Sequence, residues 1–480
     1  MPLLPPAERP VTLEPEPGER RAWLDAAARF TDALLDGLDA APALGADAGT
    51  LAALDPTVRE APRSLDAALA WLGDAARLGL QTAGPGYLAS VPGGGLYASA
   101  LAAFVSLVMN RFTAVANASP GLARLEHAIV DWLARELGLP AGTAGYLPSG
   151  GSLANFTAIV TARVARFGDS GDFSRATIYT STEAHRSVAK AARLAGIPLA
   201  NVREVGVDQR LRIDLAALAA AIAADRAKGG EPVLIVANAG TTNVGAIDPL
   251  ERLADLAAEQ GLWLHVDAAY GGAFAITPAG RRLLAGLGRA DSVALDPHKG
   301  FFLPYGTGCL LVRRGDLLRA AHAESAAYLQ DLAAATDTRS AAEHGPELSR
   351  NDRGVLLWLP LWLHGAAAFR AALEEKLALA GRLREGLRAL PVEVPLEPEL
   401  SIVTFRLPRR PDEPLSVWND RNRSFLGAIN ERQRVCLSST LLPTGLGPAF
   451  TLRACVLSFR THGDRIDAAL DDIAAACREA

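Results

Sequence analysis

The stretch Leu262–Tyr270, with the sequence LWLHVDAAY, decides the fold class of this chain. Its first part, Leu262–Val266, is a short and largely apolar run that predicts a buried strand, and Asp267 follows directly. Sheets of parallel strands bind their ligands beyond the carboxyl ends of the strands. Asp267 is therefore a candidate ligand-binding residue; a helix N-cap or a structural ion pair is the alternative interpretation.

Runs of the same kind recur on both sides of this stretch and alternate with helical patterns. The alternation predicts an α/β domain with a mostly parallel central sheet and helices on both of its faces. The other expected strands are Ala176–Thr180, Val233–Ala237, Ser292–Leu295 and Cys309–Val312. The expected helices are Leu153–Phe167, Arg186–Ala195, Leu215–Arg226 and Pro249–Gln260.

The patterns divide the 480-residue chain into three parts. For residues 1–96 we expect an amphipathic helix over Glu19–Leu38, a second helix over Ser64–Leu78 and a glycine-rich loop. Residues 97–371 form the α/β domain, and residues 372–480 form a smaller α+β domain. For the latter we expect helices Ala372–Leu390, Val417–Arg432 and Asp464–Arg478, with Asp464 as an N-cap, and strands Ser401–Arg406 and Thr451–Phe459.

The composition excludes several classes of protein. With 48 Lys and Arg against 53 Asp and Glu, the chain lacks the basic excess typical of nucleic-acid binding. No uninterrupted apolar run reaches the roughly 18 residues that predict a membrane span. The four cysteines contain no C-x-x-C pair, so neither a disulfide framework nor a thiolate metal site is expected. No apolar leader begins the chain, and we expect a cytoplasmic protein that binds no metal, membrane or nucleic acid.

Three more segments carry candidate chemistry. The turn Ser149-Gly150-Gly151-Ser152 precedes a helix, where free backbone N–H groups favour an anion; a simple capped turn is the alternative. Lys299 follows an expected strand in Asp296-Pro297-His298-Lys299, and a desolvated lysine there suits covalent catalysis on a carbonyl group. A surface lysine is the alternative. His185 follows another strand and could stack on an aromatic cofactor, or simply begin a helix.

The order of these motifs resembles the group II pyridoxal-phosphate decarboxylases, which include aromatic amino acid, glutamate and cysteine sulfinate decarboxylases. The resemblance covers residues 84–475 and includes Ala118-Ser119-Pro120 and Gly240–Gly245. It implies the fold type I architecture of pyridoxal-phosphate-dependent transferases and pyridoxal 5′-phosphate as cofactor. It also implies a homodimer with the active site at the subunit interface, in which the N-terminal segment wraps the partner.

The resemblance also implies roles for individual residues. Lys299 would bond covalently to the cofactor, Asp267 would pair with the pyridine nitrogen, and His185 and Ala269 would contact the two ring faces. The remaining cofactor-binding residues would be Gly150, Gly151, Ser152, Thr241, Thr242, Asp296 and His298. Arg453 would hold the substrate carboxylate, and Ser90, Gly93 and Ala114 would line the substrate pocket. These three residues are small, whereas aromatic-acid enzymes carry aromatic residues at the same positions.

The chain departs from the family in the segment between Lys299 and the long helix. A tyrosine that protonates Cα is expected there, yet residues 330–350 contain none, and Tyr328 lies just before them. His344 is the one histidine of the interval and becomes the candidate proton donor; a solvated loop histidine is the alternative. Gly300 also replaces the tryptophan that follows the lysine in animal aromatic decarboxylases.

These residues predict an enzyme that converts an L-amino acid to its amine and CO2. Members without the tyrosine decarboxylate and oxidise, so an aldehyde synthase is one alternative. Another fold type I reaction, by an aminotransferase or a carbon–carbon lyase, is a second. A non-catalytic binding protein on the same fold is a third, which the presence of Lys299 disfavours.

Overall fold

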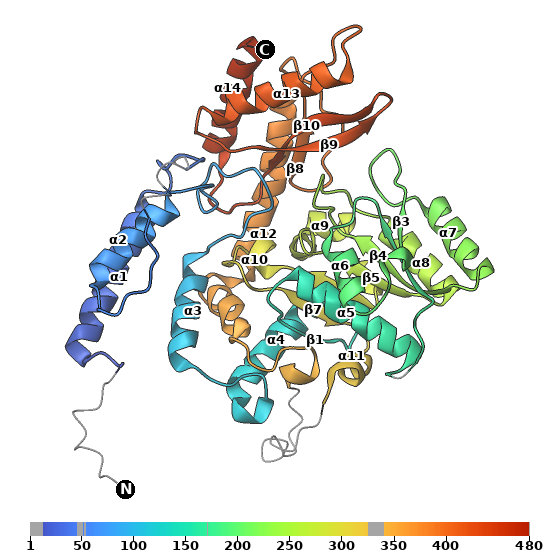
Figure 1. Ribbon diagram of the computed structural model, residues 1–480, viewed down its shortest axis with the longest axis horizontal. Coiled ribbons are helices and arrows are strands. Elements are labelled where there is room, and N and C mark those ends of the chain that lie inside the picture. Colours follow the sequence, from blue (N-terminus) through green and yellow to red (C-terminus); the bar gives the residue numbers. More distant parts are fainter. Residues whose placement is uncertain (1–12, 46–50, 52–53, 170, 325–339, 480) are drawn as a thin grey trace.

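The computed structural model describes residues 13–45, 51, 54–169, 171–324 and 340–479. Figure 1 shows a large sheet wrapped by helices, a smaller unit built from the C-terminal part of the chain, and a pair of N-terminal helices beside them. The candidate cofactor-binding residues come from the large sheet and its connections.

The large sheet has seven strands in the order β1-β7-β6-β5-β4-β2-β3. The pairs from β6 through β5, β4 and β2 to β3 are parallel, whereas β7 runs antiparallel to both β6 and β1. This sheet confirms the mostly parallel α/β class. The strands are β1 Ala144–Tyr146, β2 Ala176–Ser181, β3 Val202–Val205, β4 Glu231–Asn238, β5 Trp263–Asp267, β6 Ser292–Leu295 and β7 Cys309–Val312.

Helices cover both faces of this sheet. Alternate residues of β4 enter different hydrophobic clusters: Leu234 packs with residues of α5 and α6, while Ile235 packs with residues of α4 and α8. This period of two is what a strand buried on both faces requires. The helices of this part are α3 Tyr97–Met109, α4 Pro120–Glu136, α5 Gly151–Phe167, α6 Ser187–Leu194, α7 Leu215–Ala227, α8 Leu250–Gln260, α9 Pro278–Leu283, α10 Pro297–Gly300 and α11 Gly315–His322.

The smaller unit is an antiparallel sheet of three strands with helices packed on it. Its strand order is β8-β10-β9, with β8 Ile402–Phe405, β9 Ser438–Thr444 and β10 Gly447–Cys455, and its helices are α13 Leu415–Asn430 and α14 Gly463–Glu479. Helix α14 already begins at Gly463, so the expected N-cap role of Asp464 is wrong. Asp464 lies in the first helical turn, where its carboxylate still interacts favourably with the helix dipole.

Helix α12, Arg353–Arg388, connects the two units and is longer than the helix expected over Ala372–Leu390. Among the described residues it alone is long and apolar enough to cross a membrane by length and composition. The helix is not continuous, because Gly365 has φ 72° and ψ 155°, which no helical residue adopts. Leu373 belongs to the core of the large unit and Leu379 to the core of the small one. The boundary between the two cores therefore lies within α12.

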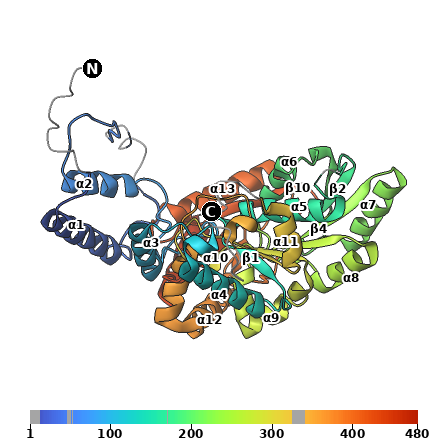
Figure 2. The ribbon, with the colours of Figure 1, turned by 90° about the horizontal axis from the view of Figure 1, so that it is seen from below.

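Helices α1, Pro17–Asp36, and α2, Leu65–Ala76, pack on each other and project from the body of the molecule (Figure 2). No residue of α1 is buried. The segment that follows them returns to the small unit, where Tyr87 pairs with Cys436 in a β-bridge. Within a single chain, the N-terminal helices therefore lack most of the packing that usually stabilises an amphipathic helix.

Candidate active site

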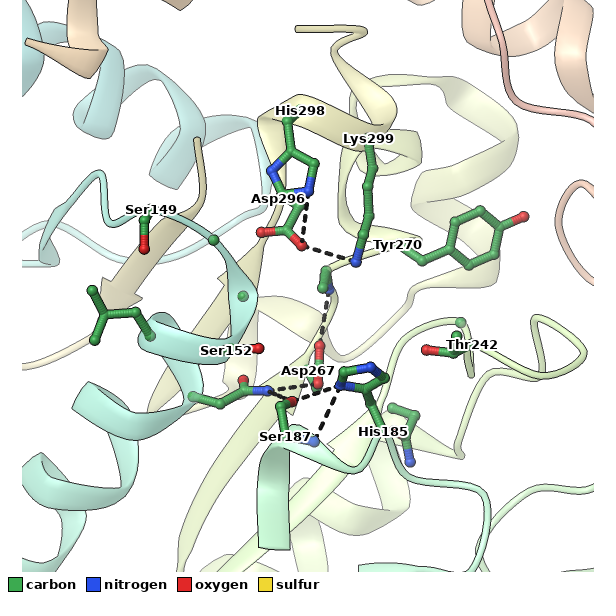
Figure 3. A pocket seen from close by; sticks show the side chains of 17 residues that line it. Ser149, Ser152, His185, Ser187, Thr242, Asp267, Tyr270, Asp296, His298 and Lys299 are labelled. Carbon is green, nitrogen blue, oxygen red and sulfur yellow. Dashed lines mark hydrogen bonds and ion pairs between the residues drawn. The ribbon is translucent and has the colours of Figure 1, made fainter. Parts of the chain in front are cut away.

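A pocket of about 300 Å³ opens where the parallel strands end (Figure 3). Strands β2, β4, β5 and β6 all point their carboxyl ends toward it, and the first turn of α5 closes one side. This is the position at which α/β sheets bind ligands. The lining residues are Ser149, Gly150, Gly151, Ser152, Leu153, Asn155, His185, Ser187, Asn238, Gly240, Thr242, Asp267, Ala269, Tyr270, Asp296, His298 and Lys299.

Asp267 is the last residue of β5, and its carboxylate is 7% exposed. Each oxygen accepts one hydrogen bond from the protein: Oδ2 from the Asn155 side chain at 2.8 Å, and Oδ1 from the Ala269 N–H at 3.1 Å. A carboxylate oxygen has a further lone pair, so both oxygens retain accepting capacity toward the pocket. Asp267 can therefore hold a cationic or N–H-bearing ligand group.

Lys299 reaches the pocket from α10, directly after β6. Its Nζ lies 2.8 Å from Oδ2 of Asp296, and the other oxygen of that carboxylate is buried with no hydrogen-bond partner among the described residues. Pro297 begins the short helix, which its fixed φ favours. A Cβ on Gly300 would lie 2.3 Å from the Cβ of Ala273, so this close packing requires glycine after the lysine.

The first turn of α5 is shaped to receive an anion. The helix begins at Gly151 after Gly150, which has no side chain to cap the free N–H groups. A Cβ on Gly151 would lie 3.1 Å both from the Cβ of Ala269 and from Oδ2 of Asp296. Ser149 and Ser152 add hydroxyl groups to the same wall. The backbone donors, the helix dipole and the space therefore suit a phosphate.

His185 lies on the loop between β2 and α6 and lines the pocket near Asp267 (Figure 3). Its Nδ1 accepts from the N–H of Ser187 at 3.2 Å and lies 2.7 Å from the Ser187 hydroxyl. Because Nδ1 accepts, a neutral ring carries its proton on Nε2, which none of these contacts occupies. Thr242 lies on the same side of the pocket, after β4.

These groups fit pyridoxal phosphate. The cofactor needs an amine for its aldehyde, a carboxylate for its ring nitrogen and N–H donors for its phosphate. Lys299, Asp267 and the turn at Gly151 supply these three in one pocket. The described residues contain no group of three His, Cys, Asp or Glu side chains that could hold a metal ion.

Two of the predicted ligands lie outside the pocket lining. Thr241 is buried, and its hydroxyl accepts from the N–H of Ala246 at 3.1 Å. Arg453 is 5% exposed, and all three of its guanidinium nitrogens donate to the protein. Nε bonds the carbonyl of Asn243 at 2.7 Å, Nη2 that of Thr242 at 2.8 Å, and Nη1 that of Ala89 at 2.6 Å.

The predicted substrate-pocket residues are also outside the lining. Ser90 is exposed and its hydroxyl lies 2.6 Å from that of Tyr87. A Cβ on Gly93 would lie 2.8 Å from the ring of Tyr305, whose own ring pairs with His298. Ala114 is fully buried.

His344 is 1% exposed, and its backbone N–H donates to the carbonyl of Ala341. It does not line the pocket of its own chain. The neighbouring residue Gly345 packs closely against the ring of Tyr146. Residues 330–339 of the predicted loop, and Tyr328, lie outside the described residues.

The sequence did not single out four polar lining residues: Asn155, Ser187, Asn238 and Tyr270. Asn155 has the clearest signal in retrospect. It lies one helical turn after Gly151, on a face of α5 that is otherwise small and apolar. A single amide on such a face indicates a buried hydrogen-bond network, although it does not indicate which partner the amide binds.

Comparison with known proteins agrees with this site. The pyridoxal-dependent decarboxylase conserved domain matches residues 50–408. An aromatic-L-amino-acid decarboxylase of Bacillus atrophaeus is 35% identical over 379 residues, which cover 78% of each chain. The Oryza sativa TDC structure with PLP and tryptamine superposes with a TM-score of 0.90 at 25% identity, over 98% of this chain and 99% of that one. The Catharanthus roseus tryptophan decarboxylase structure with L-tryptophan gives a TM-score of 0.88 at 26% identity, over 98% and 100%.

These findings confirm the predicted family, fold type I architecture, cofactor and reaction class. The family match covers most of the chain, including each strand end that supplies a pocket residue. The protein is thus an enzyme that decarboxylates an amino acid with the help of pyridoxal phosphate, and the chain belongs to the pyridoxal-dependent decarboxylase family.

Proposed function

We propose that the substrate is an L-amino acid with an uncharged aromatic side chain, and that the product is its amine. The observation that carries this proposal is the charge of the site. Among the described lining residues the charged groups other than histidine are Asp267, Asp296 and Lys299, and Lys299 is paired with Asp296. An acidic substrate side chain would therefore find no second cation in the lining of this chain.

Arg453 strengthens this argument. Its guanidinium is buried and donates to three backbone carbonyls and to the Ser438 hydroxyl, so four of its five N–H groups are used and a bidentate bond to a substrate carboxylate would have to displace existing bonds. Breaking buried bonds to a charged group is costly. We infer that Arg453 holds the loops around the site together rather than binding the substrate.

The names of the relatives point in the same direction. The Bacillus relative is an aromatic-L-amino-acid decarboxylase, and a relative from Camptotheca acuminata that is 31% identical is a tryptophan decarboxylase. One further relative, at 31% identity, decarboxylates acidic amino acids. The absence of a second lining cation in the described part of the chain favours the aromatic class.

The geometry of the pocket supports the following proposed roles. Bound pyridoxal phosphate supplies the electron sink for the electron pair left at Cα when CO2 departs. Asp267 holds the ring nitrogen in its protonated form, because a nearby opposite charge favours the cation. The N–H groups at Gly150, Gly151 and Ser152, with His298 nearby, hold the phosphate, and Lys299 holds the cofactor covalently. His185 and Ala269 hold the ring between them.

We propose further that two chains form a homodimer. Leu101, Phe104, Val105 and Val108 recur at positions i, i+3, i+4 and i+7 of α3, and all four side chains are at least 42% exposed in the single chain. Such an apolar stripe normally faces a packing partner. On α12, which lies beside α3 in both ribbon views, Trp362 is 72% exposed (Figures 1 and 2).

The occupant of this face is a second copy of the chain. Helix α1, which buries no residue in the single chain, lies near α3 in Figure 2, and its exposed Trp23 and Leu34 supply further apolar surface. We therefore retain the division into an N-terminal segment over 1–96 that reaches the partner, a cofactor domain over 97–371 and a small domain over 372–480. We also place the enzyme in the cytoplasm, where its four free cysteines stay reduced.

The test is a panel of amino acids supplied to the purified holoenzyme, with CO2, amine, aldehyde and ammonia all measured. A matched pair isolates side-chain charge: L-4-nitrophenylalanine and L-4-carboxyphenylalanine have similar shapes but different charges. We expect amine and CO2 from the aromatic substrates and a kcat/KM for the nitro compound at least about tenfold above that for the carboxy compound.

A higher kcat/KM for L-glutamate or cysteine sulfinate than for L-tryptophan would contradict the proposed substrate class. Aldehyde and ammonia in place of amine would assign the chain to the aldehyde synthases. A relative from Arabidopsis thaliana that is 30% identical is a phenylacetaldehyde synthase, so amine and aldehyde are both measured.

A further inference from the structure

A continuous line of hydrogen-bonded side chains runs from the half-buried Trp263, at the start of β5, to Asp267 at its end. The indole N–H of Trp263 donates to Oγ of Ser292 at 2.8 Å, and the same Oγ lies 2.8 Å from Nδ1 of His265. Nε2 of His265 lies 2.9 Å from Oδ1 of Asn155, whose Nδ2 donates to Asp267 at 2.8 Å. His265 is 0% exposed and Asn155 is 1% exposed.

Asn155 divides this line into two branches. Its Nδ2 also donates to Oγ of Ser187 at 3.1 Å, and that hydroxyl lies 2.7 Å from Nδ1 of His185. The Asn155 amide thus contacts both parts of the proposed cofactor site. One is the Asp267 carboxylate, proposed to pair with the ring nitrogen. The other is Ser187, which bonds to His185, the residue proposed for the ring face. Figure 3 labels Asp267, Ser187 and His185, at which these two branches end.

The direction of every bond in the line is determined by its two ends. The Asp267 carboxylate can only accept, so the Asn155 amide must turn its NH2 toward it and its oxygen toward His265. That oxygen can only accept, so His265 must carry its proton on Nε2. Its Nδ1 then accepts from the Ser292 hydroxyl, which in turn accepts from Trp263, whose indole can only donate.

The line carries no positive charge. Burial lowers the pKa of His265 to about 4, so the ring is neutral at neutral pH despite the nearby Asp267. A cationic His265 would compete for the negative charge of Asp267. A neutral N–H donor instead fixes the Asn155 amide and leaves that charge available to the pocket.

We propose that His265 and Asn155 are positioning residues that fix the orientation of the Asp267 carboxylate and so strengthen its pairing with the cofactor ring nitrogen. The inference rests on the proposed placement of Asp267 at that nitrogen. The Nε2 proton of His265 is the feature that matters, because it prevents the amide from turning its oxygen toward the carboxylate.

Two substitutions at one position isolate that proton. His265→Gln places an amide N–H near the position of Nε2 and keeps the donor to Asn155. His265→Asn has a side chain one methylene shorter, so its amide reaches only the position of Nδ1 and cannot donate to Asn155. Asn155→Leu, which removes the amide at similar volume, provides a third variant that does not alter the strand.

The measurement is the dissociation constant of each apoenzyme for two ligands: pyridoxal phosphate and its analogue with carbon in place of the ring nitrogen. The analogue keeps the phosphate and the aldehyde but cannot pair with Asp267. The ratio of the two constants therefore reports the carboxylate–nitrogen pairing alone, and binding of the analogue shows that a variant is folded with an intact phosphate site.

We expect the wild type to prefer pyridoxal phosphate. His265→Asn and Asn155→Leu should reduce this preference about tenfold, the size expected for one hydrogen bond to a charged group. His265→Gln should keep it within about twofold. The analogue should bind all four proteins with similar affinity.

An unchanged preference in His265→Asn and Asn155→Leu would overturn the inference while leaving the Asp267 assignment intact. An equal loss in His265→Gln and His265→Asn would also overturn it, because the Nε2 donor would then not be the important feature. A wild type that binds both ligands equally would instead overturn the placement of Asp267, and the inference with it.

Discussion

Asp267 is the last residue of its strand, and Lys299 and His185 each follow a strand of the same sheet by four residues. Strands β5 and β6 are paired in register from His265–Ser292 to Asp267–Ala294, so the backbone next to Asp267 and Lys299 is fixed by sheet hydrogen bonds. Residues placed in this way need little further ordering to bind a ligand. The site is consequently shaped before the cofactor enters it.

The proton that reaches Cα needs a donor, and two residues are candidates. His344 is buried and outside the pocket lining of its own chain, so His344→Gln should leave the ratio of amine to aldehyde unchanged. Tyr328→Phe removes the phenolic hydroxyl that is the other candidate general acid. It should raise the aldehyde fraction by at least about tenfold, which is a modest size for the loss of a general acid. Both ratios are measured by chromatography of the reaction products.

The opposite pattern, with aldehyde from His344→Gln and amine from Tyr328→Phe, would restore His344 as the proton donor. Arg453→Lys serves as a control for general damage, since it alters the loops around the site without removing an acid. It should lower the rate while leaving the product ratio unchanged.

Residues that end a strand could be predicted from the sequence, because an apolar run followed by a charged residue marks them. Asn155 and Ser187 could not be, since their role depends on which side chain of another element lies opposite. The placement of Arg453 was equally hidden: a sequence shows a cation, but not the backbone carbonyls of Ala89 and Thr242 that surround it.

At the scale of elements, the turn between β1 and α5 determines how the anion end of the pocket is built. Gly151 stands where any side chain would meet Ala269 and Asp296. Glycine at this position also lets the backbone approach a ligand closely, as phosphate-binding turns require.

Gly151→Val should therefore weaken the binding of pyridoxal phosphate by at least about tenfold, because the side chain would occupy the phosphate end of the pocket. Fluorescence titration of the apoenzyme measures the effect. Gly121→Val is a matched control, since a Cβ there meets nothing within 4 Å. Equal affinities in the two variants would show that the turn does not contact the phosphate.

Most strands of the large sheet and the helices between them were predicted, whereas two short strands and the first half of α12 were not. Strands β2, β4, β5, β6 and β7 and helices α5 to α8 lie within three residues of their expected bounds. Strands β1 and β3 were missed because neither is an apolar run: β1 is only the three residues Ala144–Tyr146, and β3 carries the charged residues Arg203 and Glu204. The break at Gly365 could not be predicted either, because an isolated glycine is tolerated inside many helices.

At the scale of the whole molecule, the apolar stripe on α3 is the feature that a single chain leaves unexplained. Val108→Asp would place an unpaired charge in the proposed dimer interface, where desolvation is costly. We expect the dimer dissociation constant to rise at least about tenfold and activity to fall at low protein concentration.

Sedimentation analysis of the dilute protein measures this change. Val417→Asp is the matched control, because Val417 is 51% exposed on α13, away from the stripe. If both variants keep the wild-type dimer, α3 is not the interface.

The buried line beneath Asp267 also affects stability. The pKa of His265 is about 4 in the folded protein, against about 6.5 for an exposed histidine in the unfolded chain. Between these values the unfolded chain binds the extra proton. Acid therefore destabilises the fold, by roughly 3 kcal/mol over the whole interval.

His265→Gln removes this titration, so the loss of Tm between pH 7 and pH 5 should be smaller than in the wild type. Differential scanning calorimetry of the apoenzyme at both pH values measures the loss. An identical loss in the two proteins would mean that His265 does not titrate between the folded and unfolded states.

The central claim is that Lys299 holds pyridoxal phosphate in this pocket for decarboxylation. The most direct test records the near-visible absorption of the purified protein with pyridoxal phosphate, and CO2 release from L-tryptophan, for the wild type and Lys299→Ala. We predict an absorption band and CO2 release in the wild type and the loss of both in the variant. A variant that keeps the band and the wild-type rate of CO2 release would contradict the account.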